Sequence, residues 1–135
     1  MENAKNRPAE TEVQARNAQE SGSEKLRLDA RFHLSKDRGF YGPGTHRLLQ
    51  LTEETGSLLE ACRRMGLSYS KGRKIVSLTE QQIGCPVIER QQGGRSGGHS
   101  SLTEEGQKLI RCYHDFCVEA EECLNELFQK HFHTF

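Results

Sequence analysis

The sequence predicts a mainly α-helical fold with a small β-hairpin and a β-wing, and three observations support this prediction. First, three segments with the apolar spacing of helices follow one another over residues 45–83, separated by glycines. Second, a glycine-rich basic loop, QQGGRSGGHS at residues 91–100, lies between two short β-type segments. Third, a long amphipathic segment begins at residue 103. This order is that of a winged helix-turn-helix domain followed by a long C-terminal helix.

Turn and N-cap residues divide the central segment into helices. The first helix is expected over residues 45–55, and Gly56 suits its C-terminal end. Ser57 and Glu60 have the spacing of a capping box, in which the Ser hydroxyl accepts from an amide and the Glu side chain reaches back. This motif predicts a second helix over residues 58–65. That helix is expected to pack through Leu58, Leu59, Ala61, Cys62 and Met65.

The third helix follows after a tight turn. Gly66 can supply the left-handed backbone conformation of the turn, and Ser68 is a suitable N-cap. The helix is expected over residues 69–83, where Gly84 closes it and Pro86 prevents its continuation. Together with the second helix it forms the predicted helix-turn-helix.

Short β-strands are expected on both sides of these helices. Residues 26–34 alternate between apolar and polar side chains, which predicts a half-buried strand. The turn chemistry of residues 36–39 leads to a short return strand at residues 40–41. Residues 87–88 and 101–102 are expected to form the two strands of the wing.

We expect one domain with two flanking segments. Residues 1–24 are polar and carry almost no large apolar side chain, which predicts a disordered arm. The domain covers residues 25–128, including the last helix, and residues 129–135 are a tail. No apolar run approaches the roughly 20 residues that span a bilayer, and no signal peptide begins the chain. We therefore expect a cytoplasmic protein without a membrane partner, in which the five cysteines are reduced.

Charge is distributed unevenly along the chain. The formal net charge is 0, with 19 Lys and Arg residues balancing 19 Asp and Glu residues. Residues 57–101 nevertheless carry seven basic and three acidic residues, whereas residues 102–135 carry three basic and seven acidic residues. This asymmetry predicts a central surface that attracts a polyanion, followed by an acidic helix that phosphate would repel.

The third helix and the glycine-rich loop contain the candidate DNA-binding residues. On the helix, positions 70, 73, 74 and 77 share one face, and recognition helices contact base edges mainly through their N-terminal half. Arginine can donate two hydrogen bonds to guanine, and glycines let a loop approach the DNA backbone closely. The candidate residues are Ser68, Tyr69, Ser70, Lys71, Arg73, Lys74, Ser77, Arg90, Arg95 and His99.

Other interpretations of these segments are weaker. The basic helix face could be an ordinary solvated surface, and the glycine-rich loop could be a plain connector. A nucleotide-binding phosphate loop is excluded because neither a Lys-Ser or Lys-Thr pair nor a helix follows the glycines. Cys112, His114, Cys117 and Cys123 crowd the last helix, but no pair has zinc-ligand spacing, so no metal site is expected. No arrangement of residues suggests catalysis, and no cofactor is expected.

The last helix carries an apolar stripe that is wider than packing on its own small domain requires. Its apolar residues recur at spacings of four and three, with a second row at intervals of seven. We expect the part from Ala120 to Phe132 to pack on a second copy of the chain. The predicted dimer residues are Leu109, Tyr113, Phe116, Cys117, Ala120, Cys123, Leu124 and Leu127.

Short motifs in the central region carry a family resemblance. They are ETGS at Glu54–Ser57, G-x-S-Y at Gly66–Tyr69, V-x-E-R at Val87–Arg90, GG-basic-x-GG at Gly93–Gly98 and LT-x-x-G at Leu102–Gly106. Together they resemble the N-terminal winged helix-turn-helix domain of the molybdate-responsive ModE-type transcriptional regulators, a relative of the LysR-type DNA-binding domain. The resemblance covers roughly residues 26–128.

The resemblance implies a dimeric transcriptional regulator that binds double-stranded DNA and is linked to genes of molybdate or molybdenum metabolism. It assigns residues 68–74 to the recognition helix and Arg95 to the wing. Gly72 and Arg73 replace an Ala-Trp pair that is common in the family, so the operator sequence does not carry over. No strands follow the last helix, so we do not expect this chain to bind molybdate directly. The alternatives are a thiol or metal sensor using the cysteines of the last helix, and a module that uses the fold only to dimerise or dock.

Overall fold

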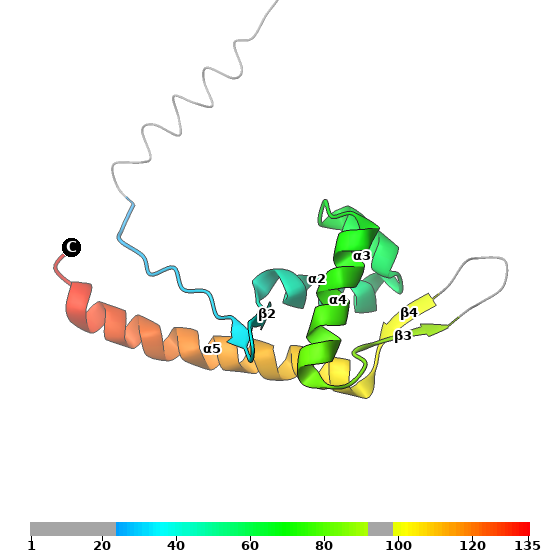
Figure 1. Ribbon diagram of the computed structural model, residues 1–135. Coiled ribbons are helices and arrows are strands. Elements are labelled where there is room, and N and C mark those ends of the chain that lie inside the picture. Colours follow the sequence, from blue (N-terminus) through cyan, green and yellow to red (C-terminus); the bar gives the residue numbers. More distant parts are fainter. Residues whose placement is uncertain (1–23, 92–98) are drawn as a thin grey trace, which may run out of the picture.

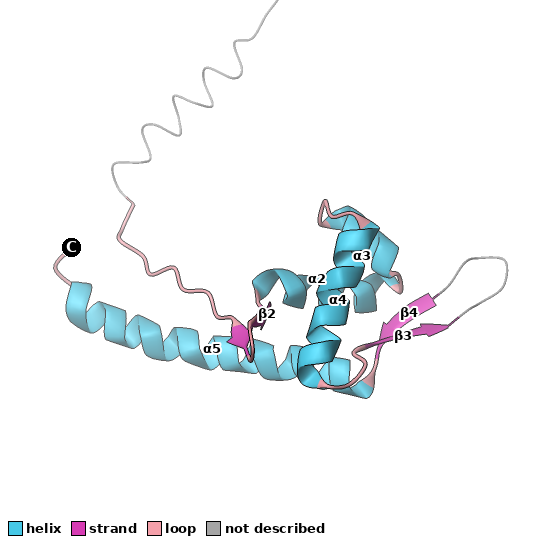
Figure 2. Cartoon of the chain, in the orientation of Figure 1, coloured by secondary structure: helices cyan, strands magenta, loops and turns pink. Residues whose placement is uncertain are grey.

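The computed structural model describes residues 24–91 and 99–135, and its elements follow the predicted order (Figures 1 and 2). The prediction of a mainly helical fold with a small hairpin and a wing is confirmed. The predicted arm, apart from Glu24, and the tip of the predicted wing lie outside the described residues. The elements are β1 (Leu34–Ser35), β2 (Gly39–Tyr41), α2 (Pro43–Thr55), α3 (Leu58–Arg64), α4 (Tyr69–Ile83), β3 (Ile88–Gln91), β4 (His99–Leu102) and α5 (Glu104–Phe132).

The N-terminal hairpin is much shorter than the sequence predicted. Its strand β1 begins only at Leu34, so the predicted strand over residues 26–34 is wrong for all but its last residue. The return strand β2 has three residues and cannot pair with the segment upstream. The side chains of Leu26 and Leu28 are exposed, whereas Phe32 contacts the ring of Phe116 on α5 edge-on, at 5.5 Å between centroids. The alternating apolar residues of 26–34 therefore do not form one strand. Phe32 packs on α5, whereas Leu26 and Leu28 are exposed.

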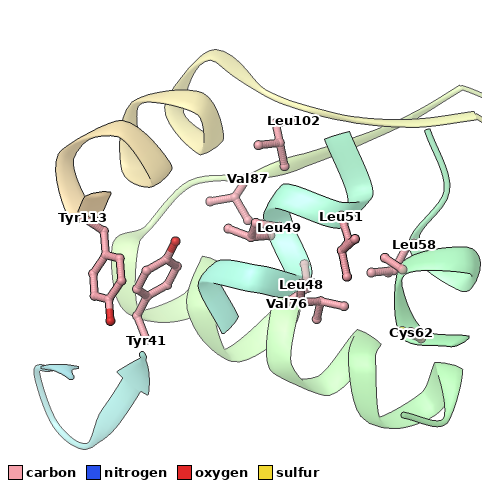
Figure 3. Close-up of a cluster of buried hydrophobic side chains, with 11 residues drawn as sticks. Tyr41, Leu48, Leu49, Leu51, Leu58, Cys62, Val76, Val87, Leu102 and Tyr113 are labelled. Atoms are coloured by element: carbon pink, nitrogen blue, oxygen red, sulfur yellow. The ribbon is translucent and has the colours of Figure 1, made fainter. Parts of the chain in front are cut away.

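The hydrophobic core surrounds α2 (Figure 3). Leu48 and Leu49 are fully buried and Leu51 is nearly so. Burying one such side chain contributes about 1.5–3 kcal/mol relative to leaving it exposed. Neighbouring elements supply the rest of the buried cluster, which consists of Tyr41, Leu58, Ala61, Cys62, Val76, Val87, Leu102 and Tyr113.

The predicted capping box at the start of α3 forms only in half. Ser57 Oγ accepts a hydrogen bond from the Glu60 amide at 3.1 Å, as expected. The Ser57 amide, however, donates to Thr55 Oγ1 at 3.2 Å, and the Glu60 carboxylate pairs with Arg64 at 3.3 Å instead of reaching back. Leu59, which was expected to pack inward, is 51% exposed because it lies on the outer face of this short helix.

Gly72 allows α3 and α4 to cross at close range. It is buried within α4, and a Cβ atom at this position would overlap Cys62 Sγ on α3. Glycine in a helix interior costs about 1 kcal/mol relative to alanine. Glycine is nevertheless required here, because a larger residue would prevent α3 and α4 from approaching so closely.

Two carboxylates attach the base of the wing to the helices. Glu80 Oε1 on α4 accepts hydrogen bonds from the amides of Val87 and Ile88, at 2.9 and 3.3 Å. Glu53 Oε2 on α2 accepts from the Leu102 amide at 2.7 Å. These residues lie where β3 and β4 pair, with Ile88 opposite Leu102. The position of the wing relative to α4 and α2 therefore depends on these side-chain hydrogen bonds as well as on packing.

The long helix α5 begins directly on the wing. Thr103 Oγ1 caps it by accepting from the Gly106 amide at 3.0 Å, while the Thr103 amide donates to the Val87 carbonyl at 3.0 Å. A Cβ atom on Gly106 would overlap that carbonyl oxygen, which explains the glycine of the LT-x-x-G motif. Within the described ranges, neither α5 nor any other helix is long and apolar enough to cross a membrane.

Tyr113 of α5 belongs to the core of its own domain. Its ring packs edge-on against Tyr41 at 5.0 Å, and its hydroxyl donates to the Phe32 carbonyl at 2.8 Å. Because Tyr113 is buried, its assignment to the dimer interface is wrong. Leu109 and Cys117, also expected at that interface, are half-buried and pack on the same core.

Burial shifts the pKa values of the aromatic cluster at this junction. The Tyr41 hydroxyl lies 2.9 Å from His46 Nδ1. Burial lowers the pKa of His46 below its usual range, and the nearby His114 lowers it further. Burial raises the pKa of Tyr41, and it also raises the pKa of Tyr113 to about 12. The cluster is therefore neutral at physiological pH.

Replacing Gly72 by alanine tests the helix crossing. Overpacking at the Cys62 contact typically costs about 1–3 kcal/mol, so we expect Gly72→Ala to lower the free energy of unfolding despite the better helix propensity of alanine. Gly44→Ala in α2 is the matched control, because a Cβ there meets nothing within 4 Å. Urea denaturation at one protein concentration measures both variants, and adding Cys62→Ala to Gly72→Ala should recover part of the loss. Equal stability of the two alanine variants would contradict the close contact.

The lowered pKa of His46 predicts a specific pH dependence of stability. The folded protein binds a proton at His46 less readily than the unfolded chain, so the free energy of unfolding should fall as the pH drops below about 6.5, the unperturbed value for histidine. His46→Gln keeps an acceptor for the Tyr41 hydroxyl and should reduce this fall, measured by urea denaturation between about pH 8 and pH 5. His131→Gln, at the exposed end of α5, is the control. A wild-type pH profile in His46→Gln would refute the assignment.

Candidate nucleic-acid interface

The polar face of α4 is exposed along its length. Ser68 Oγ caps the helix by accepting from the Lys71 amide at 3.1 Å, and Gly66 adopts a left-handed conformation in the preceding turn. On the inner side, Gly72, Val76 and Thr79 are buried against the core. This burial turns the opposite face to solvent, and its exposed polar residues are Tyr69, Ser70, Arg73, Lys74 and Ser77.

Tyr69 connects α4 with the wing strand β3. The guanidinium of Arg73, one turn further along α4, lies 5.9 Å from the centroid of the Tyr69 ring. The guanidinium of Arg90 on β3 lies 5.8 Å from the same centroid. Cation–π contacts of this kind contribute about 0.5–1 kcal/mol at exposed sites. They hold two cations beside one aromatic ring, at the junction of α4 and β3.

Arg38 and Gln81 also belong to this surface, although the sequence did not single them out. They line a hollow of about 650 Å³ together with five of the predicted residues and Leu78. Arg38 lies in the β1–β2 turn, 31 positions before Tyr69 in the sequence. A basic turn such as Lys-Asp-Arg-Gly carries no signal of its own for nucleic-acid contact, so only the packing of the hairpin on α4 shows it. The predicted residues in this hollow are Tyr69, Ser70, Arg73, Lys74 and Ser77.

Two of the predicted residues lie apart from this face. The Ser68 hydroxyl is engaged in capping α4. Lys71 lines a different hollow, between α4 and the start of α2, together with His33, Gly44 and Ile75. The structure therefore groups Lys71 with the N-terminal end of α2.

The predicted wing residues have different positions. Arg90 lies on β3 beside Tyr69, whereas Arg95 lies outside the described residues. The ring of His99 packs over Gly56 at the end of α2, where a Cβ atom would collide with it, and the adjacent Ser100 amide donates to the Gly56 carbonyl at 2.7 Å. His99 is exposed and begins β4, where it lies opposite Gln91, at the end of the strand pair away from Ile88 and Leu102. The glycine of the ETGS motif is explained by this contact and by its left-handed backbone.

The cations of the candidate interface are not neutralised by described acidic residues. Arg63 and Arg64 on α3 both pair with Glu60, at 3.5 and 3.3 Å. Arg73 and Arg90, by contrast, form no ion pair with any acidic residue in the described ranges. Glu80 lies near them, but its carboxylate accepts from two wing amides. The surface can therefore attract phosphate although the whole chain has no net charge.

The cysteines do not form a metal site in the described ranges. No group of three or more His, Cys, Asp or Glu side chains there could hold a metal ion. Cys62 is buried, and burial raises the pKa of its thiol, so it is a poor nucleophile. The alternative of a thiol or metal sensor is not favoured.

The central part of the chain is similar in sequence to a known family of regulatory proteins. The family described as "Bacterial regulatory helix-turn-helix protein, lysR family" matches residues 45–107. The molybdenum transport protein ModE of Azotobacter vinelandii is 30% identical over 105 residues, which are 77% of this chain and 39% of that protein. The molybdenum-pterin-binding protein MopB of Rhodobacter capsulatus is 38% identical over 66 residues, or 49% of this chain and 24% of that protein.

A third relative carries a functional description in its name. The DNA-binding transcriptional dual regulator ModE of Escherichia coli (strain K12) is 31% identical over 74 residues, which are 55% of this chain and 28% of that protein. The chain thus matches about a quarter to two fifths of the length of these relatives. The solved structure "Crystal structure of ArgP from Mycobacterium tuberculosis" has a TM-score of 0.47 and 23% identity, and the match covers 62% of this chain and 30% of that one.

The matched residues begin in α2 and end in the first turn of α5, so they include the exposed face of α4 and both wing strands. The resemblance of the central motifs to ModE-type proteins is confirmed by the sequence relatives. Residues 45–107 of this chain are a LysR-type helix-turn-helix domain with relatives among the ModE and Mop proteins.

Proposed function

We propose that this protein is a transcription regulator that binds double-stranded DNA by inserting α4 into the major groove. The observation that carries the proposal is the exposed face of α4, where Tyr69 holds Arg73 and Arg90 within 6 Å of its ring. An α-helix with its side chains is about 10–12 Å across, which fits the major groove. Hydrogen bonds from arginine or lysine to guanine are the most common specific contact in that groove. The described acidic residues leave both arginines available for bases and phosphates.

The residues of the interface have different proposed roles. Arg73 lies in the N-terminal half of α4, at the centre of its exposed face, and would contact base edges with Ser70 and Lys74. Arg90 on the wing strand would contact the backbone, since it lies beside the helix rather than on it. Arg95 in the wing would neutralise phosphate or enter the minor groove. Contacts to bases would carry the sequence preference, and contacts to phosphate most of the affinity.

The regulated genes are proposed to concern molybdate or molybdenum metabolism. Support comes from the names of the relatives, which describe molybdenum transport, molybdenum-pterin binding and transcriptional regulation. The part of this chain that matches the family model is the helix-turn-helix domain, at residues 45–107. The proposal therefore concerns the genes at which the protein binds DNA.

We also propose that the protein is a homodimer held together by the C-terminal half of α5. That half extends beyond the other helices (Figure 1), and its Leu127 is 52% exposed, while Phe116, just before it, is 53% exposed. Near the end of the helix, Phe128 and Phe132 stack at 5.1 Å, and the ring of Phe135 follows at 6.0 Å from Phe132. A second copy would cover these apolar side chains and would place two α4 helices on one duplex. The proposed interface also includes Ala120, Cys123 and Leu124.

Binding to DNA at different salt concentrations tests the regulator proposal. We expect the affinity for duplex DNA, measured by fluorescence anisotropy, to fall steeply as salt rises. Arg73→Ala should change the sequence preference, because a bidentate contact to guanine provides about 1–3 kcal/mol of discrimination. Arg90→Ala should weaken binding to all sequences similarly. Arg111→Ala, exposed on α5, is the control. A wild-type protein that binds no duplex at any salt concentration would refute the proposal.

Introducing a charge on α5 tests the dimer. Leu127→Asp should convert the dimer to a monomer at micromolar concentration, because the carboxylate would be buried without a partner in the interface. Leu59→Asp is a closely matched control, since Leu59 on α3 is equally exposed, at 51% against 52%. Light scattering measures the mass of both variants and of the wild type. A monomeric wild type, or a dimeric Leu127→Asp variant, would contradict this interface.

A further inference from the structure

Two hollows lie along the exposed face of α4, one on each side. The first contains Arg38 of the β1–β2 turn and the second contains Arg90 of β3. Arg73 and Ser77 line both hollows and therefore mark the ridge between them. At 3.6 residues per turn, positions 74, 78 and 81 lie on one side of this ridge and positions 76 and 80 on the other. The hollows agree with this division, because the first includes Lys74, Leu78 and Gln81 and the second Val76 and Glu80.

The β1–β2 hairpin packs beside α4. Thr79 Oγ1, which donates to the Ile75 carbonyl at 3.0 Å, also lies 3.4 Å from the Phe40 carbonyl, and Lys36 Nζ donates to the Gln82 carbonyl at 3.4 Å. A lysine at this end of a helix also interacts favourably with the exposed carbonyls of the last turn. Arg38 lies between these two attachment points in the sequence. Its place on the flank of α4 therefore follows from the packing of the hairpin.

The charge around Arg38 favours an anion. Arg38 is exposed and forms no ion pair with an acidic residue in the described ranges, including its neighbour Asp37. Lys74 and Arg73 line the same hollow, and no acidic residue does. The second hollow, across the ridge, contains Arg73 and Arg90 together with Glu80, whose carboxylate accepts hydrogen bonds from two wing amides.

We propose that Arg38 binds a backbone phosphate of the DNA strand that borders the major groove on the hairpin side, opposite the strand that the wing contacts. The inference rests on the proposed insertion of α4 in the groove. The major groove is about 12 Å wide, and a helix with its side chains is about 10–12 Å across. Cations on the two flanks of such a helix therefore face the two different strands. The β1–β2 hairpin and the wing thus contact the DNA on opposite sides of α4.

The salt dependence of DNA binding tests this inference. Each neutralised phosphate contributes a slope of about −0.9 to the logarithm of affinity against the logarithm of salt concentration. We expect Arg38→Gln to weaken binding several-fold and to reduce the slope by about that amount, both for a mixed-sequence duplex and for a duplex that the wild-type protein selects from a random pool. Arg38→Lys keeps the charge and should keep the slope.

The matched control is Arg31→Gln, in the segment before the hairpin, where Arg31 is exposed and paired with Asp29 at 3.8 Å. This variant should bind DNA like the wild type. Thermal unfolding establishes that each variant is folded. An unchanged affinity and slope in Arg38→Gln, with weakened binding in Arg73→Ala, would overturn the role of Arg38 and leave the proposed function intact. A wild-type protein that binds neither duplex would overturn both.

Discussion

The elements that carry the candidate interface all depend on one buried helix, α2. Its leucines at positions 48, 49 and 51 are buried, and β2, α3, α4, β4 and α5 all pack against it. Because interiors are close-packed, a helix that is covered on several sides allows its neighbours little freedom to shift. The angle at which α4 presents Arg73, and the place where the wing begins, therefore follow from how the chain surrounds α2.

Carboxylates complete this arrangement and also determine where positive charge remains. Glu53 and Glu80 accept hydrogen bonds from wing amides, and Glu60 pairs with Arg63 and Arg64 on α3. Glu53 and Glu80 thereby connect the wing to the helices, whereas the Glu60 pairs lie within α3, and Arg73 and Arg90 have no acidic partner in the described ranges. A chain with a formal net charge of 0 can thus present a basic face to a polyanion. The acidic residues of α5 lie on the helix that extends away from it.

The helix α5 combines two environments along its length. Near its start, Tyr113 fills the core beside Tyr41 and His46, and its burial accounts for part of the apolar stripe. Beyond it, Phe116 and Leu127 are largely exposed. A single stripe in the sequence thus contains residues that pack within the domain and residues proposed to pack on a second copy. Periodicity identifies an apolar face but does not say what covers it.

The sequence by itself determined the type and order of the elements and the N-caps of three helices. Ser57, Ser68 and Thr103 cap helices through bonds to amides three residues ahead, and such local contacts are readable from short motifs. It also identified the exposed face of α4. Only the tertiary structure decided that Gly72 meets Cys62, that Tyr113 lies inside and that Arg38 joins α4, because these contacts connect residues far apart in the chain. The residues that meet in these contacts depend on how the helices pack around α2, and this packing cannot be read from local sequence patterns.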